Sequence, residues 1–184
     1  MRMVRDGVLE DDPARLAADC AEIEKFIETE CLDPERGYRA APDLDMADAS
    51  CLIIPNYGYI DARDLRFQRT FESIDRELGL GRGLLLRYPP GFDGLESHEN
   101  AFGLCSFWAV EALARMGRRD EAEQRMRALV DHAGELGFYA EEIDRHTGDA
   151  MGNYPQAFSH VGLILAAHAI CRARQDRQGG RTAP

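Results

Sequence analysis

Two adjacent glutamates, Glu141 and Glu142, lie in a polar loop over residues 137–153 and follow the aromatic pair Phe138–Tyr139. A glycosidase needs one carboxylate that takes a proton from water and a second that protonates the leaving oxygen. Aromatic rings suit such a site because sugars present apolar C–H faces. A pair of loop glutamates alone is more often a solvated loop end, so the pattern indicates glycoside chemistry only together with other motifs.

Other side chains that could bind metals or phosphate are spaced in ways that favour structural roles. His160 and His168 lie in one predicted helix without a carboxylate or cysteine at ligand spacing, so we expect helix histidines and no metal site. The glycines of residues 79–83 lack the lysine and the strand–helix setting of a phosphate-binding loop and indicate a helix stop. Asp48 could face a site, but helix capping explains it as well.

The cysteines indicate the compartment. They are five in number, widely spaced and contain no Cys-x-x-Cys pair. This usage is typical of reduced thiols in a cytoplasm and argues against a zinc site. The first twelve residues have no apolar core and no small-residue cleavage site, so we expect no signal peptide and a cytoplasmic protein.

The elements that must position these groups are helical. Asp12 is expected to cap a helix whose first position is Pro13. This helix should reach about Glu28. Its apolar stripe consists of Leu16, Cys20, Ile23 and Phe26–Ile27. Residues 47–55 suit a short buried helix and a strand about equally well. Further helices are expected from Asp61 or Asp64 to about Leu78, over 102–116, from about Asp120 to Leu136, and from Tyr154–Pro155 to Ile170.

The connections between these helices alternate between short turns and long polar loops. In a stacked or toroidal array of helical hairpins, the long loops gather at one end and build a site. No repeat of fixed length is visible, which argues against a tetratricopeptide-type solenoid. The sequence therefore predicts an all-α protein with its functional residues on one set of loops.

Three ordered blocks resemble glycoside hydrolase family 15, which holds glucoamylases, related α-glucan hydrolases and some trehalases. The blocks are RYP at 87–89, ENAFGLCSFWAVEAL at 99–113 and AEEIDRHTGDAMGNYPQAFSHVGLI at 140–164, and the likeness extends from about Asp12 to Ile170. The resemblance implies an (α/α)6 toroid, with about half of the double ring of helices in this chain. Residues 1–174 would form the C-terminal part of the catalytic domain, and residues 175–184 a polar, disordered tail.

The resemblance also implies roles for individual residues. Glu141 matches the general base of the family, and Arg87 matches an arginine that binds substrate hydroxyls near the cleavage point. Tyr88 would form a neighbouring wall, and Glu99 and Phe102 would line the site. Glu142, which follows the base, is expected to contact the substrate. The implied chemistry needs no cofactor and no metal.

The family's general acid is expected outside this chain. It lies in a Trp-Glu motif on an earlier helix and loop, whereas Trp108 is the only tryptophan here and precedes an alanine. The chain is expected to begin about where the second half of the toroid begins. An inverting pair of carboxylates stands about 6.5–9.5 Å apart across the bond. General acid–base assistance is worth roughly a hundredfold to ten-thousandfold, so the chain alone is expected to be weak or inactive.

The acidic composition limits the kinds of molecule that the chain can bind. The formal net charge is -11 and the sequence pI about 4.9, so the surface repels phosphate backbones and anionic membranes. No apolar run reaches the length of a membrane span. Nucleic acid and membrane are therefore not expected, whereas an α-glucoside oligosaccharide or trehalose is compatible with this charge. The other expected partner is a missing N-terminal half, or a second copy through self-association.

Two functions remain open from the sequence. The first is inverting hydrolysis of α-glucosidic bonds, glucoamylase-like or trehalase-like, with the base in this chain. The second is a catalytically inactive helical fragment or carbohydrate-binding remnant, or one half of a two-chain enzyme. The sequence does not choose among starch oligosaccharides, maltose, isomaltose and trehalose.

Overall fold

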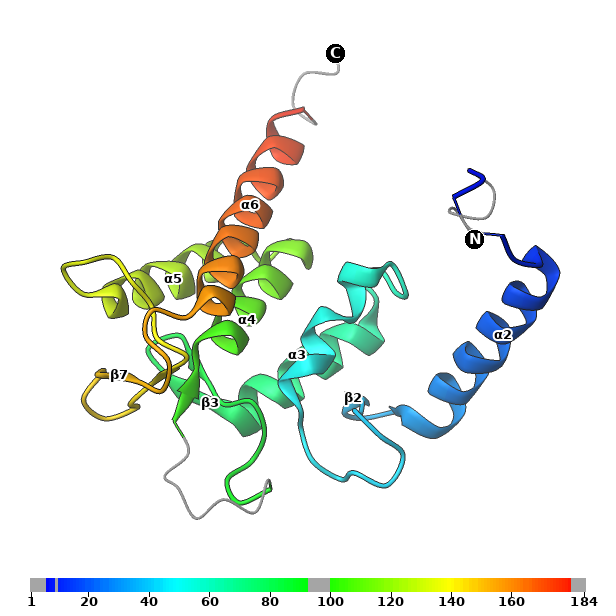
Figure 1. The fold of residues 1–184 in the computed structure, drawn as a ribbon, viewed down its shortest axis with the longest axis horizontal. Coiled ribbons are helices and arrows are strands. Elements are labelled where there is room, and N and C mark those ends of the chain that lie inside the picture. The colour runs from blue at the N-terminus through cyan, green and yellow to red at the C-terminus, as the bar shows by residue number, and fades with distance from the viewer. Residues whose placement is uncertain (1–5, 9, 93–99, 180–184) are drawn as a thin grey trace.

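The computed structural model describes residues 6–8, 10–92 and 100–179, and these are mostly helical, as the sequence predicted (Figure 1). The helical elements are α2 (Pro13–Phe26), η1 (Ile27–Cys31), η2 (Ala49–Tyr57), α3 (Leu65–Leu78), α4 (Gly103–Arg115), α5 (Arg119–Val130), η3 (Asp131–Ala133) and α6 (Ala157–Gly179). None of the helices in the described part is long and apolar enough to cross a membrane. All five cysteines are free thiols.

Three helical elements of the described residues begin at side-chain caps that the sequence indicated. An Oδ1 of Asp12 accepts a hydrogen bond from the Ala14 amide at 2.9 Å, with Pro13 in the first helical position of α2. Asp64, one of two expected caps, opens α3 in the same way. The ambiguous segment after Asp48 forms a 3-10 helix, η2, which Asp48 caps. Each cap satisfies an amide that has no partner within its own helix.

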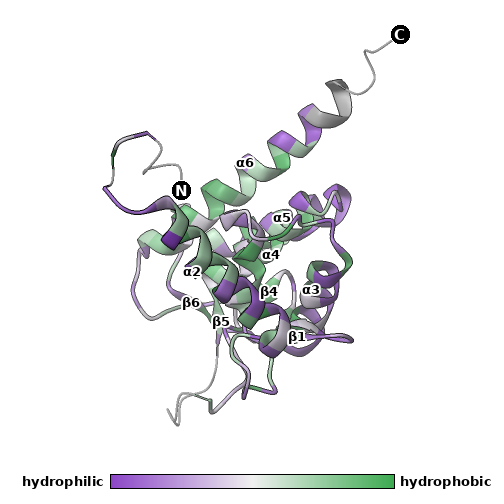
Figure 2. Cartoon of the chain, turned by 90° about the vertical axis from the view of Figure 1, so that its right-hand side faces the viewer, coloured by the Kyte–Doolittle hydropathy of each residue, from purple (hydrophilic) through white to green (hydrophobic). Residues whose placement is uncertain are grey.

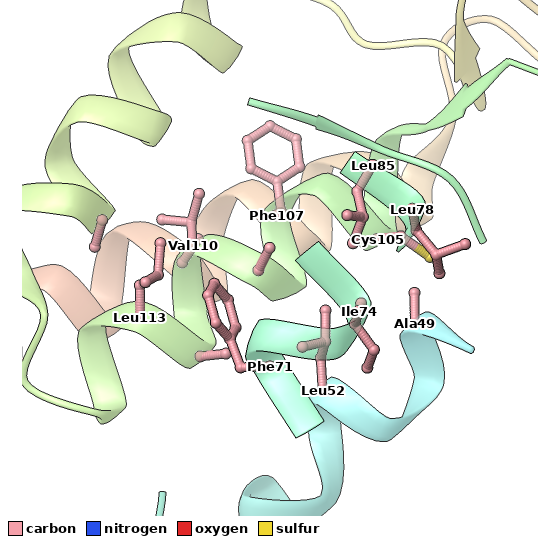
Figure 3. Packing of buried hydrophobic residues seen from close by; sticks show 14 of the residues in the cluster. Ala49, Leu52, Phe71, Ile74, Leu78, Leu85, Cys105, Phe107, Val110 and Leu113 are labelled. Atoms are coloured by element: carbon pink, nitrogen blue, oxygen red, sulfur yellow. The ribbon is translucent and has the colours of Figure 1, made fainter. Parts of the chain in front are cut away.

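Helix α4 forms the centre of the hydrophobic core. Its side chains Phe107 and Val110 are buried to 1% exposure or less, and the helix lies beside α3 and η2 (Figure 3). Phe71 and Ile74 come from α3, and Leu52 comes from η2. Because α4 is apolar on nearly every side, it is stable only when other helices enclose it.

Helix α6 packs closely against α4 along one face. A Cβ added at Gly162 would stand 3.0 Å from Phe107 Cβ and 3.0 Å from Leu104 Cδ1, so this glycine permits the two helices to approach. The opposite face of α6 is apolar but open to solvent, as the green first half of the helix in Figure 2 shows. Its exposed side chains are Phe158, Val161, Ile164 and Leu165.

Helix α2 forms where it was predicted, but its apolar stripe is not buried. The expected apolar stripe is present, but none of the residues of α2 is buried, and Ile23 and Phe26 are 59% and 51% exposed. The helix stands apart from α4 and α6 (Figure 1). It ends at Phe26 and continues as the π turn η1 to Cys31, beyond the predicted end. The stripe stays exposed because the described residues provide no second helix for it to pack on.

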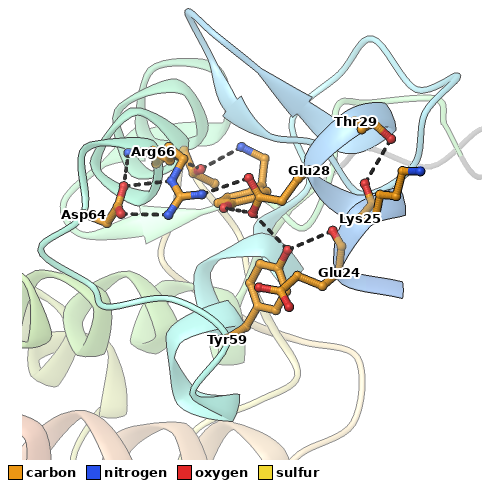
Figure 4. A network of polar contacts seen from close by, with 9 residues as sticks. Glu24, Lys25, Glu28, Thr29, Tyr59, Asp64 and Arg66 are labelled. Atoms are coloured by element: carbon orange, nitrogen blue, oxygen red, sulfur yellow. Dashed lines mark hydrogen bonds and ion pairs between the residues drawn. The ribbon is translucent and has the colours of Figure 1, made fainter. Parts of the chain in front are cut away.

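A polar network fastens α2 to the core through Glu28 of η1 (Figure 4). The hydroxyls of Tyr38 and Tyr59 donate to Glu28 Oε1 at 2.8 and 2.9 Å, and Arg66 Nη1 donates to Oε2 at 2.8 Å. Arg66 is in turn held by Asp64 through two hydrogen bonds. Burial raises the pKa of Glu28, but the tyrosine hydrogen bonds and the Arg66 charge outweigh it and hold the pKa below its ordinary value of 4.5.

The long loops contain short strands. They form two hairpins and a three-stranded antiparallel sheet in the order β5-β6-β7. The strands are β1 (Leu32–Asp33), β2 (Gly37–Tyr38), β3 (Gly79–Gly81), β4 (Leu84–Leu85), β5 (Ala101–Phe102), β6 (Glu142–Ile143) and β7 (Ala150–Met151). These loops precede η2, α4 and α6, whereas short turns at 58–64 and 116–118 follow η2 and α4.

Helix α6 runs to Gly179, so residues 175–179 of the expected polar tail are helical. Glutamine, arginine and aspartate are tolerated in a helix, and residues 175–178 contain no proline or glycine. Residues 180–184 of that tail lie outside the described residues.

Replacing Glu28 with glutamine should destabilise the protein by about 1–2 kcal/mol, because hydrogen bonds to a charged group contribute roughly 1.5–3 kcal/mol and less near solvent. The lowered pKa means that ionised Glu28 contributes stability above its ordinary pKa, and the contribution is lost as pH falls through the folded-state pKa. The difference in unfolding free energy between wild type and Glu28→Gln should therefore shrink between about pH 6 and pH 3 in urea titrations. Glu24→Gln, at an exposed position of α2, is the control, and an equal loss in both variants would contradict the assignment.

Candidate active site

The three-stranded sheet brings two of the predicted site segments together at the start of α4. Phe102 in β5 lies opposite Glu142 in β6, and Ala101 lies opposite Ile143. The Gly103 amide donates to the Glu141 carbonyl at 2.9 Å. Phe102, Glu141 and Glu142 thus meet at the N-terminus of the central helix, although about forty residues separate them in the sequence.

The segment before Glu141 is anchored to the start of α6. The Ser159 hydroxyl donates to the Ala140 carbonyl at 2.7 Å, and the Gln156 amide donates to the Tyr139 carbonyl at 2.8 Å. Tyr139 is 2% exposed, and its ring stands edge-on to Phe107 at 5.1 Å. The tyrosine is therefore a core residue that fixes the loop, and it offers no face to a sugar.

The Glu141 carboxylate is held by Asn153. The Asn153 side-chain amide donates to Glu141 Oε2 at 2.8 Å, and the Asn153 backbone amide donates to the same oxygen at 3.3 Å. The backbones are also joined, since the Glu141 amide donates to the Asn153 carbonyl at 2.9 Å. Within the described residues Oε1 accepts no hydrogen bond, so this oxygen of a half-buried carboxylate can receive a proton from water.

The Glu142 carboxylate has a different partner from the Glu141 carboxylate. Its Oε2 accepts a weak hydrogen bond from the side-chain amide of Asn100 at 3.4 Å. The structure therefore holds the two glutamates with two different asparagines, Glu141 with Asn153 and Glu142 with Asn100.

Arg87 lies at the same end of the helices and follows β4. Its guanidinium forms an ion pair with Asp48, and its carbonyl accepts a hydrogen bond from the Ala49 amide at 2.9 Å. Its Cζ stands 5.8 Å from the centre of the Tyr88 ring, which packs edge-on against Phe92 at 5.3 Å. The Arg87 guanidinium and the Tyr88 ring thus lie side by side at this end of the helices.

Two observations place Arg87 near the start of α4. Burial raises the pKa of the Cys105 thiol to about 12, and the nearby Arg87 charge acts in the opposite direction. The Ser106 hydroxyl joins the two loops, because it receives a hydrogen bond from the Leu85 amide and donates to the Phe102 carbonyl. Arg87 and Glu141 therefore flank one helix end, although no contact between them is found among the described residues. Glu99, the remaining predicted site residue, lies outside the described residues.

A hollow of about 780 Å³ lies at the other end of the helices, and none of the candidate site residues lines it. Its walls come from the ends of η2 and α4 and from the second half of α6. The described residues contain no group of three or more histidine, cysteine or acidic side chains that could hold a metal.

Sequence reasoning missed two residues of the site and set a third aside. Asn153 and Asn100, which bond the two glutamates, occur in segments that signal only turns. Asp48 was explained by capping, a role that it does have, but its ion pair with Arg87 joins positions far apart in the sequence. No local pattern could show that pairing.

Comparison with known proteins identifies the family. The model for "Glycosyl hydrolases family 15" matches residues 2–129 and 119–168. The chain belongs to this family. A family member named trehalase from Thermoplasma acidophilum is 42% identical over 120 residues, and "Trehalase 1" of Sulfolobus acidocaldarius is 32% identical over 149 residues. These matches take in 65% and 81% of the chain but only 20% and 26% of the relatives, so the chain spans about a fifth to a quarter of their length.

Solved structures agree on the fold of this family-15 chain. A wild-type glycosidase superposes with a TM-score of 0.74 at 18% identity, over 86% of this chain and 44% of that one. A glycosidase solved in complex with glucose gives 0.75 at 17% identity, over 90% and 47%. The chain has the fold of part of an (α/α)6 toroid, as its sequence predicted.

Replacing Gly152 with alanine should disturb Glu141. Gly152 has φ +71°, and a Cβ there would stand 3.1 Å from Glu141 Oε2 and 3.2 Å from Glu141 Cβ. Gly58 is the matched control, since it has φ +73° but open space around its Cβ position. Both variants should lose about 1 kcal/mol from backbone strain, and Gly152→Ala about 1 kcal/mol more from crowding, measured by urea unfolding. Amide NMR signals of Glu141 and Asn153 should shift only in Gly152→Ala, and equal effects would contradict the close packing.

Proposed function

We propose that this chain carries the general base of an inverting glycosidase that hydrolyses α-glucosidic bonds. The observation that carries the proposal is the Glu141 carboxylate, whose Oε2 is held by Asn153 while Oε1 is left without a partner among the described residues. Arg87 at the same helix end supplies donors for sugar hydroxyls, and Phe102 and Tyr88 supply apolar walls. Membership of family 15 supports this reaction class.

In the proposed reaction, Glu141 removes a proton from a water whose oxygen attacks the anomeric carbon. The bond between that carbon and the glycosidic oxygen breaks, and the leaving oxygen receives a proton from a carboxylic acid on the other side of the bond. The base ends protonated and the acid ionised, and exchange with solvent restores both. Because water attacks opposite to the leaving group, an α-glucoside releases β-glucose.

The proposed substrate is α,α-trehalose, with short α-gluco-oligosaccharides as the alternative. The curated relatives at 32% to 42% identity bear the name trehalase, which supports trehalose over α-gluco-oligosaccharides as the substrate. A neutral disaccharide is also compatible with a chain of formal net charge -11.

The acid is proposed to come from the remainder of the ring. Two open apolar surfaces support a larger assembly: the outer face of α6, with Phe158 64% and Ile164 65% exposed, and the stripe of α2. Solved glycosidases of this fold have more than twice the length that this chain covers. On this proposal the chain alone binds sugar weakly and turns over slowly or not at all.

The second candidate, a non-catalytic helical fragment, is favoured by the same open faces, because exposed apolar patches promote self-association. A chain whose open faces bury one another would form oligomers without an acid, and the site would bind sugars at most.

The test of catalysis uses trehalose, followed by ¹H NMR of the released anomers. The chain is assayed alone and with a Thermoplasma acidophilum trehalase that lacks its matching segment. Inversion yields one α- and one β-glucose from each trehalose, whereas retention yields α-glucose only. Glu141→Gln should lower turnover roughly a hundredfold to ten-thousandfold, and Glu135→Gln, an exposed glutamate of the preceding turn, should have no effect. Turnover that survives in Glu141→Gln would rule out the base assignment.

The test of the open faces is size-exclusion chromatography with light scattering. The chain alone should associate in a concentration-dependent way, and Val161→Lys with Leu165→Lys on the outer face of α6 should make it monomeric. Leu65→Lys is the control, because Leu65 is 67% exposed on α3. A wild-type chain that stays monomeric at high concentration would contradict self-association.

A further inference from the structure

We propose that Asp48 is a positioning residue of the active site, which acts by holding the Arg87 guanidinium in place for the sugar. This inference rests on the proposed function, since it deepens the role of Arg87. It starts from the ion pair between the two side chains, which come from different loops at the same end of the helices.

Asp48 itself is poorly placed to touch a substrate. Its side chain is only 12% exposed. Its Oδ1 accepts the Ser50 amide at 2.8 Å, and the same oxygen faces Arg87 Nη1. A carboxylate engaged in this way has little access to water or sugar, so its effect on a reaction passes through the arginine.

Arg87 needs such a partner for an electrostatic reason. Its carbonyl takes the first free amide of η2, from Ala49, and its charge acts on Cys105 in the first turn of α4. The guanidinium therefore stands near the N-termini of two helices, where the partial charge is positive and a cation is disfavoured. Asp48 compensates this charge from the cap position of η2.

The ion pair with Asp48 leaves part of the Arg87 guanidinium available for other hydrogen bonds. The Arg87 side chain is 32% exposed although Nη1 is buried against Asp48. A planar guanidinium carries five N–H donors in a fixed geometry, so anchoring one side directs the others. The exposed donors would face the space bordered by Tyr88 and the start of α4, where the proposal places sugar hydroxyls.

The test replaces Asp48 with asparagine, which keeps an oxygen for the Ser50 amide and removes the charge. Asp64→Asn is the matched control, because Asp64 caps α3 and pairs with Arg66 in the same manner but belongs to the Glu28 network. Both variants should fold. With trehalose as substrate in the reconstituted assay, Asp48→Asn should lower kcat/KM roughly tenfold to a hundredfold, with the same division between kcat and KM as Arg87→Ala. Asp64→Asn should leave both constants unchanged.

Two further measurements separate positioning from a general loss of stability. In an Arg87→Ala background, Asp48→Asn should cause no additional loss of kcat/KM, because the residue acts through Arg87. The Nε–Hε NMR signal of Arg87, assigned with Arg87→Lys, should shift or broaden in Asp48→Asn and stay unchanged in Asp64→Asn. Additive kinetic losses together with an unperturbed Arg87 signal would overturn the assignment of Asp48. Absence of hydrolysis in the wild type would count against the proposed function, whereas the NMR comparison would still decide the role of Asp48.

Discussion

The enclosure of helix α4 is the constraint on which the rest of the structure depends. Its residues are apolar on almost every side, so η2, α3, α5 and α6 must surround it. That arrangement places the loops before η2, α4 and α6 at one end, and there the loop of Glu141 pairs with the strand of Phe102. The geometry of the site is thus a consequence of burying one helix.

Helix boundaries and caps were predictable because their signals are local. Asp12 and Asp64 cap helices through amides two residues ahead, and the glycines after Leu78 end α3. The β5–β6 pairing was not predictable, since two-residue strands leave no periodic pattern and their partners lie far apart in sequence. The same limit applies to Asp48, whose cap is local but whose arginine partner is not.

The apolar stripe of α2 shows what residue spacing cannot predict. Spacing predicted which residues share a face, but burial depends on what lies opposite, and Ile23 and Phe26 face no helix within the described residues. For the site, the resemblance to the family carried the assignments of Glu141 and Arg87 to one end of the helices. It could not supply Asn153, whose bond to Glu141 depends on the fold of the β6–β7 hairpin.

The bond from Ser159 to the Ala140 carbonyl connects the segment of Glu141, the proposed base, to the helix whose outer face is open. Anything that packs on α6 and shifts it by a fraction of an ångström would carry the Glu141 segment with it. Docking on that face and the position of the proposed base would then be thermodynamically linked, so each would change the other by the same free energy. Catalytic activity would in that case report whether a partner is packed on the outer face of α6.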